Sequence, residues 1–316
     1  MSHAIPPRGH AACSTNGARG CSATSGRGTP AHGGAGSRTP HRDADPPRSL
    51  DADEELLPAP AHPWEVPLLV VCALVNLLAV AALAYAVWSV SGSPWWTVGV
   101  PAAVPVGLWA VRGLRYARQR AESVKISPTQ FPEAYRMVAS LSAGMGLSRI
   151  PEAYVRAGGD HRVTRTDAGG HRLHRYLVLP NDLFEVGERL RDPDAVAFLI
   201  AHQLGHVAAG HTGFWRRLAT LGGHLVPGLG AALSRSMEYT ADNHAFTHCP
   251  QGVHAVRLYA GGKHLYSRIN MGEMADRART DRGLSLLVYH LLSHRPSNTR
   301  RMAALRDRAR RGRVFL

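Results

Sequence analysis

The feature that most constrains this chain is a long apolar run over residues 66–90, VPLLVVCALVNLLAVAALAYAVWSV. Asn76 is its only strongly polar side chain, and no charged residue interrupts it. A helix needs roughly 20 apolar residues to cross the hydrocarbon core of a bilayer, so this run is long enough to do so. The sequence therefore predicts a transmembrane helix here.

A second apolar run follows at residues 94–111, after an uncharged connector. Its length is marginal for a span, and Pro101 and Pro105 leave a re-entrant segment open as an alternative. Tryptophans lie near the ends of both runs, as they do at membrane–water interfaces. We expect the two runs to form a transmembrane helical hairpin within residues 63–120, with the lipid bilayer as its partner.

The placement of arginines predicts the orientation of this hairpin. The second run is followed directly by Arg112, Arg115, Arg118 and Arg120. The connector between the runs carries no charge, and positive charge is retained on the cytoplasmic side of a membrane. The sequence therefore predicts a multi-pass protein of the cell (plasma) membrane, with residues 112–316 and the N-terminal tail in the cytoplasm.

The N-terminal tail, residues 1–62, is rich in Gly, Pro, Ser, Arg and His and has no apolar period. Such a segment buries too little apolar surface to offset chain entropy, so we expect a disordered polar tail. The net charge of +14 comes almost wholly from arginine. Because no basic stripe with interleaved aromatic residues occurs, nucleic acid is not expected as a partner.

Residues 121–316 have the pattern of a mostly helical α+β domain with a small sheet. The segments Tyr154–Val155 and Tyr176–Leu179 are typical of short strands, and a polar loop separates them. Further along, Asp192 precedes a proline and a second acid, which is typical of a helix start. We expect a strong helix from there.

That helix carries the sequence FLIAHQLGHVAAGH over residues 198–211. His202 and His206 are four residues apart, so both imidazoles face the same side and can chelate one ion. Among 18 histidines two further pairs have this spacing, His244/His248 and His290/His294. Only the first pair lies in a helix that is apolar on nearly every side, where imidazoles without partners would be costly. They are therefore metal ligands or, as the alternative, core histidines that hydrogen-bond to carbonyl groups.

A catalytic zinc usually has three protein ligands and one open position, so the pair predicts a third ligand elsewhere. His211 is nearby, but on a continuous helix it lies about 180° round the axis from His202. Glu238 and Asp242 are better placed, since four-residue spacing puts both carboxylates on one helix face. One can bind the ion while the other holds a ligating imidazole by its free N–H. A solvated helix face is the alternative.

These motifs together resemble the HtpX-like membrane zinc endopeptidases, relatives of the CAAX prenyl endopeptidases (metallopeptidase family forty-eight). AHQLGHVAAGH is similar to the family's A-H-E-x-x-H-x-x-x-x-H, and RSMEYTAD to its R-x-x-E-x-x-A-D. SHRPSNTR is similar to a third motif, S-x-H-P-P-x-x-x-x-R. The resemblance implies a zincin-like peptidase domain over residues 121–316. It further implies one Zn²⁺ per chain bound by His202, His206 and Glu238, with Asp242 behind the ligands and His294 or Arg300 stabilising charge on the tetrahedral intermediate.

The sequence departs from this family at the general base. Gln203 occupies the position of the glutamate that takes a proton from the attacking water and delivers it to the leaving amine. Loss of a positioned base costs on the order of 10²–10⁴ in rate, so we expect the metal site to persist with weak or absent hydrolysis. Two further departures are an edge strand with no clear counterpart between Tyr154 and Leu179, and Arg295 in place of a proline.

Three functional hypotheses follow. The leading one is a membrane-anchored, zinc-binding metallopeptidase homologue with impaired hydrolysis, a pseudoprotease that binds membrane or misfolded proteins as clients. The first alternative is an active metalloendopeptidase that uses another base, such as a neighbouring glutamate or His294. The second alternative is of another class: a metal-free membrane scaffold that acts through its disordered tail.

Overall fold

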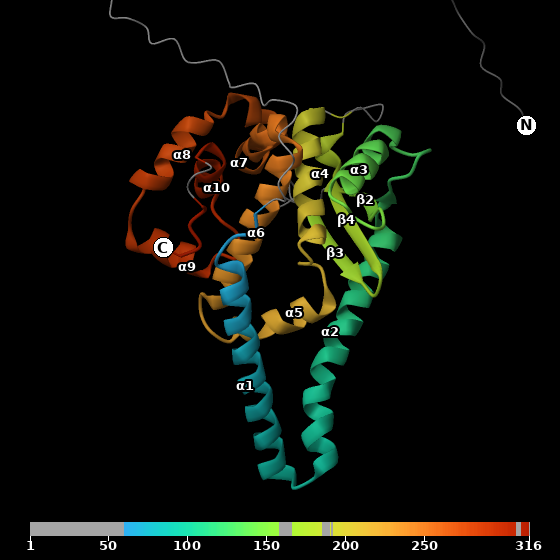
Figure 1. Ribbon diagram of the computed structural model, residues 1–316, viewed down its shortest axis with the longest axis vertical. Coiled ribbons are helices and arrows are strands. Elements are labelled where there is room, and N and C mark those ends of the chain that lie inside the picture. The colour runs from blue at the N-terminus through green and yellow to red at the C-terminus, as the bar shows by residue number, and fades with distance from the viewer. Residues whose placement is uncertain (1–59, 158–165, 185–189, 191, 308–310, 316) are drawn as a thin grey trace, which may run out of the picture. The chain divides into compact units, whose positions relative to one another are not determined.

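The computed structural model describes residues 60–157, 166–184, 190, 192–307 and 311–315. These residues are mostly helical and include a mixed sheet of four strands (Figure 1), which confirms the expected helical α+β composition. The predicted disordered tail lies outside them except for residues 60–62. Within those three residues, His62 is buried and its backbone N–H donates to the Thr240 hydroxyl over 2.9 Å.

Two long helices come first, α1 (Glu65–Ser91) and α2 (Pro94–Glu122), which are close together where the short connector joins them and spread apart toward the other elements (Figure 1). Both are long and apolar enough to cross a membrane, and few of their side chains are buried. Pro101 and Pro105 lie inside α2. The second apolar run is therefore part of one continuous helix that includes both prolines.

The remaining helices are shorter. They are α3 (Pro132–Gly144), α4 (Pro193–Ala208), α5 (Phe214–Thr220), α6 (Leu229–His248), α7 (Val256–Leu265), α8 (Met271–Thr280), α9 (Leu284–Leu292) and α10 (Asn298–Arg306), with 3₁₀ turns η1 (Asn181–Leu183), η2 (Leu221–His224), η3 (Pro250–Ala255) and η4 (Tyr266–Arg268). The predicted start of α4 is confirmed, since the Asp192 side chain accepts a hydrogen bond from the backbone of Ala195.

The sheet has the order β1-β2-β4-β3, with β1 at Val124–Lys125, β2 at Glu152–Arg156, β3 at Asp167–His171 and β4 at His174–Pro180. β2 and β4 pair in parallel, and the other pairs are antiparallel. β2 and β4 contain the two strands predicted from the sequence. β3 lies within the segment that was expected to be only a polar loop.

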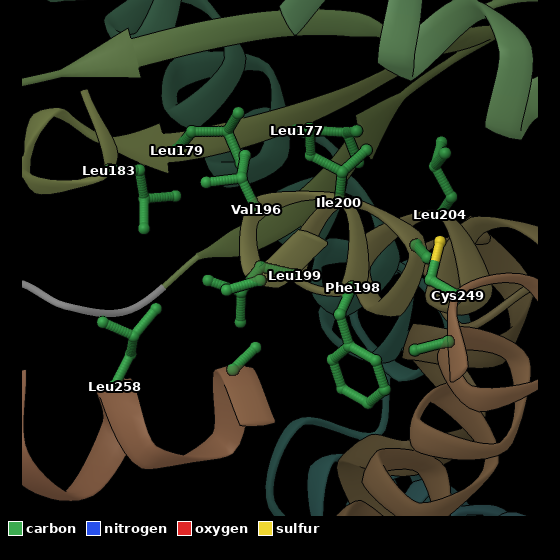
Figure 2. Close-up of a cluster of buried hydrophobic side chains, with 14 of the residues drawn as sticks. Leu177, Leu179, Leu183, Val196, Phe198, Leu199, Ile200, Leu204, Cys249 and Leu258 are labelled. Carbon is green, nitrogen blue, oxygen red and sulfur yellow. The ribbon is translucent and has the colours of Figure 1, made fainter. Parts of the chain in front are cut away.

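The main core lies on both sides of α4. Figure 2 shows Val196 and Ile200 of α4 pointing toward Leu177 and Leu179 of β4. On the opposite side, Phe198 of α4 belongs to the same buried cluster as the helices that follow it. Because α4 is buried on nearly all sides, as its apolar sequence predicted, the polar side chains that it carries need partners inside the protein.

α5 and the turn η2 that follows it pack tightly against α1. The side-chain amide of Asn76 donates to the Leu218 carbonyl over 3.4 Å. A Cβ atom added to Gly222 would lie 2.4 Å from the backbone nitrogen of Asn76 and 2.5 Å from the Cys72 carbonyl oxygen. Only glycine fits at this contact, which joins the domain to α1 well inside its apolar run.

Candidate metal centre

The candidate centre lies where α4 crosses α6. α4 carries His202, Gln203 and His206, and α6 carries Glu238. The two helices approach closely because Gly205 has no side chain: a Cβ there would lie 3.2 Å from both the Cα and the carbonyl oxygen of Ala241. The glycine inside the HQLGH motif thus allows the carboxylate of α6 to reach the histidines of α4.

Three side chains converge at this crossing. His202 Nε2 lies 3.5 Å from Glu238 Oε2, and His206 Nε2 lies 3.8 Å from Glu238 Oε1. One ligand atom from each residue lies within 4.8 Å of the others. Two atoms bound to one tetrahedral zinc lie about 3.3–3.6 Å apart, so the spacing is close to that of a complete ligand set. This His/His/Glu group could therefore bind a metal ion.

His202 is held from behind by a buried ion pair. Its Nδ1 lies 2.9 Å from Asp242 Oδ1. Asp242 also accepts hydrogen bonds from two guanidinium nitrogens of Arg301, which lies on α10 and is itself buried. Because the carboxylate can only accept, the Nδ1–H of His202 donates to it, so the neutral form of His202 has a lone pair on Nε2, whereas the protonated form donates from Nε2 to Glu238. Asp242 thus takes the position behind the ligands that the resemblance implied.

His206 is held in the same way by a residue that was expected to point elsewhere. α4 ends at Ala208, and Gly210 has a φ of 74°, which turns the chain back. His211 Nδ1 therefore comes within 2.8 Å of His206 Nδ1, and its Nε2 lies 2.9 Å from Glu65 Oε1. The expected half-turn separation from the pair was wrong, because the helix does not continue as far as His211.

The charges of this site are strongly coupled. Burial lowers the pKa of His206 well below its ordinary value. Burial acts the same way on His202, but the hydrogen bond and charge of Asp242 outweigh it and raise the pKa of His202. Burial opposes ionisation of Glu238, yet the hydrogen bond with His202 holds the pKa of that carboxyl well below its usual range. The carboxylate is therefore ionised and ready to bind a cation.

Gln203 is buried beside the ligands. Its side-chain amide donates to the Thr166 hydroxyl over 2.7 Å, and that hydroxyl lies 3.4 Å from the Tyr259 hydroxyl. Thr166 directly precedes β3, which is at the end of the strand order. The segment between Tyr154 and Leu179 thus contains a strand at an edge of the sheet, and this strand begins next to the partner of Gln203.

The two basic residues predicted near the C-terminus lie at other contacts. The exposed ring of His294 stacks on His224 with ring centroids 5.5 Å apart. Arg300 donates to the Phe315 carbonyl over 3.1 Å. Their immediate neighbours reach the site instead: Arg295 Nε lies 3.6 Å from Glu238 Oε1, and Arg301 binds Asp242. Sequence reasoning missed both arginines, although each adjoins a residue that it selected.

The site is therefore a largely buried His/His/Glu group, in which His206 is partly exposed, with one partner behind each histidine and an uncharged amide beside it. Comparison with known protein families, with characterised proteins and with solved structures found no match to this chain.

Proposed function

We propose that this chain is a membrane-anchored, zinc-binding homologue of the HtpX-like metallopeptidases in which peptide-bond hydrolysis is impaired. The observation that carries the proposal is the convergence of His202, His206 and Glu238, with ligand atoms within 4.8 Å of one another. Two imidazoles and one carboxylate are a known ligand set for catalytic zinc, and they leave a fourth position open. The zincin-like character of the domain and its zinc are parts of this proposal.

Gln203 argues against efficient hydrolysis. When bound in such a site, zinc polarises a substrate carbonyl and makes water more acidic. A base must still take the proton and return it to the leaving amine. The amide of Gln203 has no basic oxygen, and its NH₂ group is already directed to Thr166. The three candidate ligands are therefore present, but the side chain at the position of the general base cannot carry a proton. This combination favours binding of a peptide over its hydrolysis.

The edge strand β3 is where a client peptide would bind. β3 is last in the strand order, and an extended peptide can add to the edge of a sheet by main-chain hydrogen bonds. Thr166 links the start of this strand to Gln203, so a peptide on that edge would lie near the metal group. Exposed, extended segments of membrane or misfolded proteins are the clients that this arrangement suits, and α1 and α2 would anchor the domain in the bilayer.

One experiment tests the proposal. Zinc content and casein cleavage are measured for the full-length wild-type chain and for Gln203→Glu, with Gln251→Glu as the matched control at an exposed glutamine. We expect zinc in all three and cleavage only in Gln203→Glu, with a gain on the order of 10²–10⁴. Wild-type cleavage that a chelator abolishes would favour an active enzyme with another base. Absence of bound zinc, unchanged by His202→Ala, would leave the metal-free scaffold.

A further inference from the structure

The first residue of α1 contacts the candidate metal centre. Glu65 is 146 positions before His211 in the sequence, yet its Oε1 lies 2.9 Å from His211 Nε2. It is only 3% exposed, although it begins a helix that is long and apolar enough to cross a membrane. Arg216 and the Thr240 hydroxyl donate to the same carboxylate. Three side chains from later in the chain therefore bind one buried acid.

The positions of the protons follow from what each group can donate. The Glu65 carboxylate can only accept, so the hydrogen of a neutral His211 is on Nε2. His211 Nδ1 then has a lone pair and must accept from the atom 2.8 Å away, His206 Nδ1. That places the hydrogen of His206 on Nδ1. Its Nε2, the atom that faces Glu238, is left with a lone pair for a metal ion.

We propose that Glu65 is a positioning residue that acts through His211 to fix the tautomer and ring orientation of His206, so that the start of α1 is part of the metal centre. The inference rests on the metal binding proposed above. Each of the two histidine ligands then has a carboxylate that orients it. Asp242 orients His202 directly, and Glu65 orients His206 through one intervening imidazole. Partners of this kind typically change metal affinity 10–100-fold when they are removed.

A consequence is that the position of α1 and metal affinity are linked. Displacement of α1 takes the Glu65 acceptor away from His211, and His206 is then free to place its hydrogen on Nε2, where it blocks the metal. Because coupling between two equilibria is reciprocal, a bound metal must stabilise the packing of α1 by the same free energy. A purely structural role of Glu65, as the partner of Arg216, would hold α1 in place without any effect on the tautomer of His206.

The test reads the tautomer directly. The full-length chain is labelled with ¹⁵N-histidine, stripped of metal, and examined in detergent by long-range ¹H–¹⁵N spectra at about pH 8, where ordinary imidazoles are neutral. The His206 signals are assigned by their loss in His206→Gln. We expect the Nδ1–H tautomer in the wild type and a mixture in His211→Leu, with zinc affinity lowered 10–100-fold. His211→Gln should restore both, because its amide oxygen accepts from His206 while its NH₂ group donates to Glu65.

Two further variants keep the test decisive. In the paired variant Glu65→Leu/Arg216→Leu the carboxylate is lost without leaving an unpaired charge, and we expect the same mixed tautomers. Arg112→Gln removes a hydrogen bond to the neighbouring Thr212 carbonyl and should change neither readout. An unchanged tautomer in both His211→Leu and the paired variant would overturn the proposal. A wild type that binds no zinc overturns the proposed function instead, while the tautomer of the metal-free chain still decides the role of Glu65.

Discussion

Gly205 and His244 touch where α4 crosses α6: a Cβ atom on Gly205 would lie 2.7 Å from the Cβ of His244. Real Cβ atoms do not approach this closely, and the backbone of Ala241 lies next to the same point, so neither helix can give way locally. The distance between the ligands of α4 and Glu238 on α6 is therefore set by the absence of one methyl group.

Gly205→Ala should separate the two helices. We expect a loss of about 1–3 kcal/mol in the free energy of unfolding, which is typical of overpacking, together with weaker zinc binding because Glu238 moves away from the histidines. Thermal unfolding and zinc titration in detergent measure the two effects. Gly107→Ala in α2 is the matched control, since a Cβ there meets no atom within 4 Å. Equal behaviour of the two variants would contradict this account of the crossing.

As the solution is acidified, zinc affinity should begin to fall at a higher pH than it would for an ordinary imidazole ligand. Asp242 raises the pKa of His202, so a proton competes with zinc for Nε2 already above the ordinary value of 6.5. The sign follows directly: a raised pKa means that the protonated, metal-excluding form persists to higher pH, and affinity increases as pH rises through it.

Competition with a coloured chelator over a series of pH values measures this effect. Asp242→Asn removes the charge that raises the pKa of His202, so the decline should begin at a lower pH, although affinity at high pH also falls. Asp276→Asn removes an exposed carboxylate paired with Arg306 and should leave the profile unchanged. An onset at the same pH in wild type and Asp242→Asn would show that Asp242 does not control His202.

The part of the site that the sequence predicted depends on spacing within single helices. Four-residue spacing places His202 with His206 on α4, and Glu238 with Asp242 on α6, whatever the rest of the chain does. The burial of α4 was also predictable, because its apolar residues occur on nearly every side. These features come from local geometry, which a sequence pattern records directly.

The remaining contacts depend on chain reversals and long-range packing. His211 reaches His206 only because Gly210 adopts a left-handed conformation, and a glycine alone does not predict which way the chain turns. Glu65 comes from a distant apolar helix, where an acid at the first position has the appearance of an ordinary helix start. On α10, the choice between Arg300 and Arg301 depends on the rotation of the helix about its axis, which its neighbours determine.

Stability should decrease at high pH because of one buried thiol. Burial, with a contribution from Asp194, raises the pKa of Cys249 to about 11 from 9.0. The folded protein therefore retains the proton where the unfolded chain loses it, so stability is unaffected below about pH 9 and falls as pH rises toward 11. Denaturant unfolding from pH 8 to 11 should show a steeper decline for wild type than for Cys249→Ala. Parallel profiles would exclude a contribution of this thiol.

Gly222→Val should detach the domain from α1. Its side chain would begin 2.4 Å from the backbone nitrogen of Asn76, and a helix backbone cannot move aside without taking α1 with it. We expect a clear fall in melting temperature.

The same variant tests the positioning role of Glu65. Gly222 packs on Cys72 and Asn76 of α1 and not on Glu65. Because Glu65 lies on the same helix, displacement of α1 should nevertheless cost His206 its Nδ1–H tautomer and lower zinc affinity. Gly99→Val in α2 is the control, since a Cβ there meets no atom within 4 Å. A Gly222→Val chain that melts earlier but keeps full zinc affinity would separate the packing of α1 from the metal centre.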